Sequence, residues 1–149
     1  MKMTVHERPG VYSSYNSSTV VNGGGGRKTV GLVGVCAGVE AVGKVQTVTS
    51  FEEASALFGS CELTELIRII LRNGAGSVAA LAIENEDGYT AGFETLEKLE
   101  NLPVIVCGST KAEVHTALRT SVESASALRR ERIAVVGGGR NEAVAALAA

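Results

Sequence analysis

Short apolar runs alternate with helix-forming segments from residue 28 onward, and this alternation limits the fold more than any other feature of the sequence. Five of these segments are short and rich in Val, Ile and Leu or in β-branched residues, a pattern typical of strands in a buried sheet. The predicted strands are residues 28–36, 44–50, 77–83, 103–108 and 132–139. Between and after them, apolar side chains recur at helical spacing. The predicted helices are residues 50–59, 62–74, 89–101, 110–130 and 141–149.

Several helix boundaries carry local signals. Ser50 with Glu53, and Thr110 with Glu113, fit capping boxes at helix starts. Glycines 59 and 74 fit helix ends. The resulting order, β-β-α-α-β-α-β-α-β-α, predicts an α/β fold with a largely parallel or mixed sheet and helices on both faces.

The longest predicted helix has an apolar stripe and a basic end. We expect its buried side to consist of Val114, Leu118, Val122, Ala125 and Leu128, with His115 on the solvated side. The run Arg129–Arg132 then suits the negative end of the same helix. The final predicted helix stops on alanine without a cap, so we expect residues 27–149 to be one α/β domain that is incomplete at its C-terminus.

Residues 1–26 have no helical period and predict an extended arm. Pro9-Gly10 is turn chemistry, and short β-prone pieces follow it. Asn22 and the four glycines at 23–26 predict a flexible hinge. Residues 1–29 carry a net charge of +3, which leaves −5 on the remainder. A weakly basic arm beside an acidic body favours attraction between copies of the chain.

The overall composition excludes several classes of protein. A chain of 149 residues suits one domain, and a net charge of −2 gives no sign of a nucleic-acid partner. No apolar run reaches the length of a membrane span. Cys36, Cys61 and Cys107 form no paired motif and are predicted to be reduced thiols, as in a cytosolic protein.

Motifs for chemistry are weak throughout. Residues 38–45 have the spacing of a phosphate-binding loop, but Val45 replaces the metal-binding hydroxyl and a predicted strand follows, so a glycine-containing hairpin or loop is favoured. Gly31, Gly34 and Gly38 miss the dinucleotide pattern, and Gly137 begins a strand-to-helix turn. His6 and His115 have no catalytic partner, and residues 84–88 read as a solvated acidic turn. We therefore predict no catalytic, cofactor-binding or metal-binding residues and no enzyme. The alternative is a small α/β nucleotide-binding or enzymatic domain with a disordered N-terminal tail.

Several stretches resemble contractile tail sheath proteins of bacteriophages and contractile injection particles. The resemblance begins in HERPGVYSSY at residues 6–15 and continues at residues 64–78, 103–110 and 117–138, so it covers essentially the whole chain. Members of that family are usually longer and continue into a C-terminal region.

The resemblance implies a structural role. Sheath subunits stack as rings into a helical tube around an inner tail tube, and the tube shortens to drive penetration of a cell envelope. It implies that copies of this chain are linked by strand-exchanging arms, in a virion tail or contractile particle that is assembled in the bacterial cytoplasm. Carried over to this sequence, the intersubunit arm contains Pro9, Gly10, Val11, Tyr12, Tyr15, Val20 and Val21, and the hinge contains Gly23, Gly24, Gly25 and Gly26.

Overall fold

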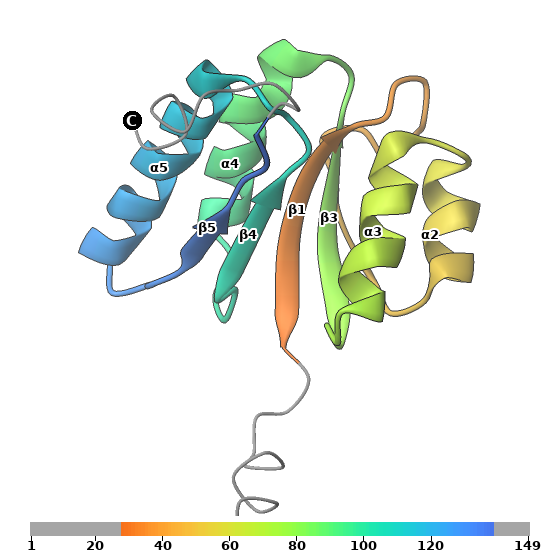
Figure 1. The fold of residues 1–149 in the computed structure, drawn as a ribbon, viewed down its shortest axis with the longest axis horizontal. Coiled ribbons are helices and arrows are strands. Elements are labelled where there is room, and N and C mark those ends of the chain that lie inside the picture. Colours follow the sequence, from red (N-terminus) through yellow and green to blue (C-terminus); the bar gives the residue numbers. More distant parts are fainter. Residues whose placement is uncertain (1–27, 139–149) are drawn as a thin grey trace, which may run out of the picture.

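A five-stranded mixed sheet lies at the centre of the computed structural model, which describes residues 28–138 (Figure 1). Its strand order is β2-β3-β1-β4-β5. The strands are β1 (Thr29–Val35), β2 (Val45–Val48), β3 (Ser77–Ile83), β4 (Val104–Cys107) and β5 (Ile133–Val135). All pairings are parallel except the one between β2 and β3. The predicted fold class is confirmed, whereas the arm, the hinge and the helix predicted at 141–149 lie outside the described residues.

Helices cover both faces of this sheet (Figure 1). Helices α2 (Phe51–Phe58) and α3 (Glu62–Arg72) lie on one face, and α4 (Tyr89–Glu97) and α5 (Ala112–Ala127) lie on the other. A short 3-10 turn, η1 (Glu86–Gly88), precedes α4. Leu32 and Val33 of β1 point to opposite faces and are both fully buried, in separate apolar clusters. The continuous apolar run of β1 is therefore explained by burial on both sides.

Two glycines let the helix layers approach the sheet closely. A Cβ atom on Gly92 of α4 would lie 2.8 Å from Cγ1 of Val33. A Cβ atom on Gly34 of β1 would lie 2.9 Å from Cδ1 of Leu63, on α3. A larger residue at either position would force the facing side chain or the helix itself to shift.

The predicted ends of α2 and α3 agree with the structure. The Ser50 hydroxyl accepts a hydrogen bond from the Glu53 amide at 3.2 Å, as an N-cap should. Gly59 and Gly74 have φ angles of 69° and 99°, in the left-handed region that glycine tolerates best. The sequence predicts these helix ends correctly because serine can cap a helix start with its hydroxyl group and glycine tolerates a positive φ angle.

The predicted limits of α5 are wrong at both ends. The helix starts after Lys111, which makes no side-chain cap, so Thr110 and Glu113 form no capping box. It ends at Ala127 rather than Arg130, because Arg129 adopts a left-handed φ of 59°. The Arg130 and Arg129 amides donate to the carbonyls of Ala125 and Ser126, which is the Schellman pattern. Leu128 is consequently 62% exposed and does not belong to the buried stripe.

Candidate functional site

The carboxyl edge of the parallel strands is where open α/β sheets usually bind ligands, at the point where successive connections go to opposite faces. Here that point lies between the carboxyl ends of β1 and β4. The Gly108 amide donates to the Val33 carbonyl at 3.0 Å across the gap. A Cβ atom on Gly108 would already lie 3.1 Å from Leu66 Cδ1 and 3.3 Å from the Tyr89 hydroxyl. Side chains from both helix layers, Leu66 of α3 and Tyr89 of α4, therefore pack closely against the carboxyl end of β4.

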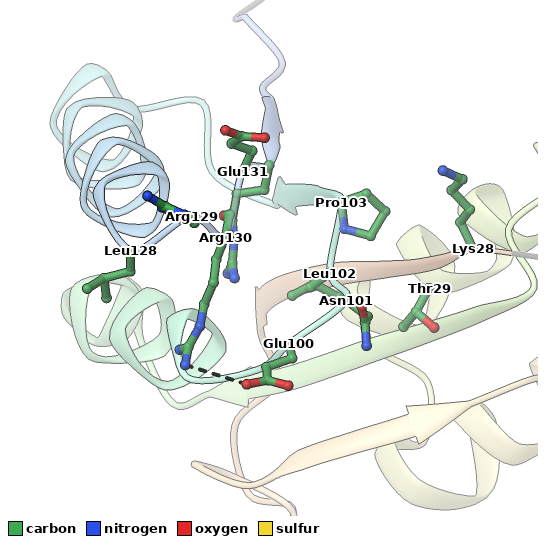
Figure 2. A pocket seen from close by; sticks show the side chains of 11 residues that line it. Lys28, Thr29, Glu100, Asn101, Leu102, Pro103, Leu128, Arg129, Arg130 and Glu131 are labelled. Carbon is green, nitrogen blue, oxygen red and sulfur yellow. Dashed lines mark hydrogen bonds and ion pairs between the residues drawn. The ribbon is translucent and has the colours of Figure 1, made fainter.

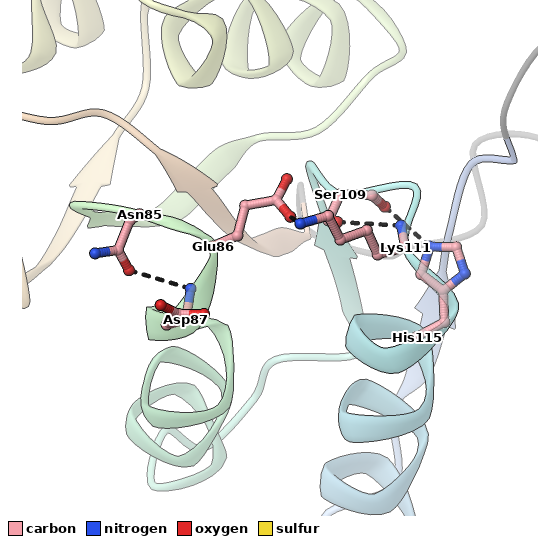
Figure 3. Close-up of polar contacts among 6 residues, drawn as sticks. All are labelled: Asn85, Glu86, Asp87, Ser109, Lys111 and His115. Atoms are coloured by element: carbon pink, nitrogen blue, oxygen red, sulfur yellow. Dashed lines mark hydrogen bonds and ion pairs between the residues drawn. The ribbon is translucent and has the colours of Figure 1, made fainter.

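The polar side chains at this edge bind each other (Figure 3). The Glu86 carboxylate and the Lys111 ammonium group are 2.5 Å apart and join η1 to the start of α5. The hydrogen bond to Glu86 raises the pKa of Lys111. A ring nitrogen of His115 lies 2.9 Å from the Ser109 carbonyl oxygen. His115 is thus half-buried against the preceding loop, and its expected position on the solvated side of α5 is wrong.

The segment with phosphate-loop spacing is a loop that leads directly into a strand. Gly38 and Gly43 have φ angles of 77° and 75°, and the Gly43 amide donates to the Ala82 carbonyl at 2.9 Å. Val45 begins β2, so no helix follows whose N-terminus could bind a phosphate. The prediction of a glycine-containing loop is confirmed. The turn that Gly137 was predicted to begin extends beyond the described residues.

The acidic turn after β3 is locally organised. The Asn85 side-chain oxygen accepts a hydrogen bond from the Asp87 amide at 3.1 Å, which closes η1 (Figure 3). Among residues 28–138, no three side chains of the metal-binding types gather into a site. Within the same residues, no helix has both the length and the apolar character needed to cross a bilayer.

The basic run Arg129–Arg132 contacts a different helix from the one predicted. Arg132 is only 6% exposed, and its Nη1 and Nη2 atoms donate to the carbonyls of Leu96 and Leu99 at 3.1 and 3.0 Å. Arg130 reaches the Glu97 carbonyl at 3.3 Å. The guanidinium groups therefore satisfy carbonyls at the C-terminal end of α4, where positive charge is favourable. Sequence reasoning recognised the dipole effect but assigned it to α5.

An open hollow of about 840 Å³ lies at the opposite, amino edge of the sheet. Figure 2 shows Lys28, Pro103 and Arg129 around it, with Arg130 paired to Glu100. The lining is mostly polar and charged and lies beside the N-terminal end of β1. Ligands of open α/β sheets usually bind at the carboxyl edge, so the position of this hollow at the amino edge does not by itself indicate a ligand site.

Strand β5 forms one edge of the described sheet and carries exposed apolar side chains. Ile133 is 67% exposed, and Val135 and Val136 are 48% and 45% exposed. The Ile133 amide donates inward, to the Pro103 carbonyl at 2.8 Å. Because successive residues of a strand direct their amides to opposite sides, the Ala134 amide points away from β4. Sequence reasoning found this strand but had no signal for its edge position.

The fold is shared with a protein of a contractile particle. The structure is similar to a chain in the cryo-EM structure of the anti-feeding prophage helical sheath in its contracted state, with a TM-score of 0.60 and 16% sequence identity. The match covers 97% of this chain and 43% of that chain, so this chain spans less than half of the length of the sheath protein. No model of a known protein family matches the sequence, and no curated protein sequence does.

We expect no rise in the melting temperature of the 149-residue chain when ATP, GTP or NAD is added. A nucleotide at 100 times its dissociation constant would stabilise the folded state by about 2.7 kcal/mol. Leu66 and Tyr89 pack closely against the carboxyl end of β4, and a strand instead of a helix follows the glycine loop, so neither place has the usual features of a nucleotide site. Differential scanning fluorimetry measures this directly, and a clear rise with any of the three would favour a nucleotide-binding domain.

Proposed function

We propose that this chain is a structural subunit of a contractile tail sheath, which polymerises into a helical tube through strand-exchanging arms and has no enzymatic activity. The observation that carries the proposal is the fold match, over nearly the whole chain, to a helical sheath from a contractile particle. The sequence resemblance points to the same class of assembly. The fold match and the sequence resemblance thus favour the same role.

The proposed link between subunits is the N-terminal arm. Val11 to Val21 would add as a strand to a sheet of another copy, with Gly23 to Gly26 spanning the gap. Strand addition supplies main-chain hydrogen bonds, and a head-to-tail contact of this kind generates an open helical polymer. The hinge would allow the link to persist while the subunit bodies move during contraction.

We infer that the outer edge of β5 receives this strand. The edge combines the outward amide of Ala134 with the exposed side chains of Ile133 and Val135. An exposed apolar edge strand is a template for pairing with another chain. Its apolar side chains would be covered by the incoming β-prone residues of the arm.

The same proposal also implies a partner, the inner tail tube, and a location for the assembled protein. The assembled sheath would surround an inner tail tube in a virion tail or related contractile particle, after assembly in the bacterial cytoplasm. This role needs neither a nucleic-acid partner nor a membrane span.

Replacing Ala134 with proline tests the proposed edge. Proline removes the outward amide but leaves the amides that bond to β4, and Ile133 already has the extended conformation that precedes proline easily. In the full-length protein, we expect Ala134→Pro to fold and to form no stable tubes. Electron microscopy and sedimentation measure assembly, and circular dichroism checks folding.

Ala134→Val is the matched control, because valine is similar in size to proline and keeps the backbone amide. We expect this variant to assemble like the wild type. Normal tubes from folded Ala134→Pro protein would rule out the β5 edge as the receiving site. Absence of tubes from the wild-type full-length protein would instead count against the sheath function itself.

A further inference from the structure

Two of the three cysteines lie together at the carboxyl edge of the sheet, on the side of α2 and α3. Cys36 directly follows β1, and its amide continues the ladder by donating to the Ile83 carbonyl at 2.9 Å. Cys61 is the N-cap residue of α3. All three cysteines are free thiols in the structure.

The backbone places these two thiols in the same region of the fold. A Cβ atom on Gly34 would lie 3.8 Å from the Cα atom of Leu63, so the end of β1 and the first turn of α3 almost touch. Cys36 lies two residues after Gly34 and shares its face of the strand. Cys61 lies two residues before Leu63. Both side chains belong to one apolar cluster on this face of the sheet, with Cys61 packed against a core that includes Cys36.

The surroundings give the two sulfur atoms different properties. Cys36 is 3% exposed and donates to the Phe58 carbonyl at 3.3 Å, and burial raises its pKa to about 12. Cys61 is partly exposed, and its sulfur lies 3.4 Å from the Thr64 hydroxyl. Partial burial of Cys61 disfavours the charged thiolate and by itself would raise the pKa. Polar neighbours of Cys61, among them Cys36 and Thr64, outweigh the effect of burial and hold the pKa of Cys61 below its usual value.

We propose that Cys61 is a peroxide-sensitive modification site and that Cys36 is its resolving partner, so that oxidation links β1 to α3 through an intramolecular disulfide. Nothing in the sheath role requires this chemistry, and it is independent of assembly. Cys61 combines access from solvent with a position at the N-terminus of α3, where the helix dipole favours a thiolate. Cys36 is shielded from solvent and lies in the apolar cluster against which Cys61 packs.

The proposed reaction consumes one hydrogen peroxide. The Cys61 thiolate attacks one peroxide oxygen, the O–O bond breaks, and the departing hydroxide takes a proton to become water. Cys61 is then a sulfenic acid. The Cys36 sulfur loses its proton and attacks the Cys61 sulfur, the S–O bond breaks, and hydroxide leaves as a second water. Two thiols are oxidised to one disulfide while peroxide is reduced to two waters.

Cys107 is an internal control for reactivity. It is 6% exposed, lies in the core on the opposite face of the sheet, and donates to the Ser109 carbonyl at 3.6 Å. Burial raises its pKa. It has neither a neighbouring thiol in its cluster nor a helix amide at its sulfur, so it should react more slowly than Cys61 with any thiol reagent.

The test is peptide mapping of the 149-residue chain after treatment with hydrogen peroxide and then N-ethylmaleimide. Trypsin cleaves after Lys28, Lys44 and Arg68, so the expected product is a disulfide between peptides 29–44 and 45–68 that dithiothreitol releases. Cys107 should carry N-ethylmaleimide. Without peroxide, Cys61 should be alkylated at pH 7 at least about tenfold faster than Cys107.

Single substitutions assign the two roles. Cys36→Ala should prevent the disulfide and leave a sulfenic acid on Cys61 that dimedone captures, whereas Cys61→Ser should leave Cys36 unmodified. Cys107→Ala should form the disulfide at the wild-type rate. The proposal fails if the wild-type chain forms no such crosslink, or if Cys61 reacts no faster than Cys107. Both of these results come from the unaltered protein, so a variant that does not fold leaves the test intact.

Discussion

A full-length protein that lacks residues 1–24 should fold and stay soluble but form no stable tubes. The described body, residues 28–138, has a buried apolar cluster on each face of the sheet, so we expect it to fold without the deleted segment. Assembly should be lost completely, because the arm is the proposed donor of the main-chain hydrogen bonds between subunits. Negative-stain electron microscopy detects tubes, and sedimentation at low and high salt measures their stability.

A variant with residues 1–21 in scrambled order is the control for this deletion. It keeps the length and the charge of the arm but disrupts the order of its β-prone residues. If the strand sequence matters, the scrambled arm should assemble poorly as well. Tubes of normal length and salt resistance from the deleted protein would contradict the proposed role of the arm.

Replacing Arg132 with alanine should lower the free energy of unfolding by about 3 kcal/mol, because the change removes the charge-assisted hydrogen bonds of a buried guanidinium group. Three carbonyl groups accept from it, those of Leu96, Leu99 and Arg130. Arg132→Lys should lose most of the same stability, since an ammonium group lacks the planar fork that reaches all three. Urea denaturation of the 149-residue chain measures both variants.

Arg119→Ala is the matched control on an exposed helical surface. Arg119 is 71% exposed and pairs with Glu123 on the same helix, so its loss should cost less than about 0.5 kcal/mol. An unfolding free energy for Arg132→Ala within about 1 kcal/mol of the wild type would show that water replaces the guanidinium at the end of α4.

Local patterns predicted the elements of the fold well wherever one residue type has one physical reason to be present. The predicted strand 77–83 matches β3 exactly, and Ser50, Gly59 and Gly74 mark helix limits as expected. The continuous apolar runs correctly indicated a sheet covered on both faces. The order of the strands within that sheet is known only from the three-dimensional structure, because an apolar run in the sequence does not show which strands pair with each other.

Errors arose where tertiary contacts override local preference. Arg129 adopts a left-handed conformation that is usually left to glycine, so nothing in the sequence marked the end of α5. Arg132 lies 33 and 36 residues beyond two of the carbonyls that it caps, a distance that no local motif spans. Cys36 and Cys61 are likewise separated in sequence and meet only because α3 packs on β1. The predicted arm and hinge residues remain predictions, since they lie outside the described part of the chain.

The central position of β1 has a mechanical consequence. The described chain enters the sheet at Thr29, and β1 pairs with β3 on one side and with β4 on the other, both parallel. The Thr29 hydroxyl also lies 2.8 Å from the Ser77 hydroxyl at the first position of the ladder. A pull along β1 from its N-terminal end would load both ladders in shear, so many hydrogen bonds would have to break together. Tension that reaches the domain through Lys28 therefore meets a stiff anchor instead of a strand that peels away bond by bond.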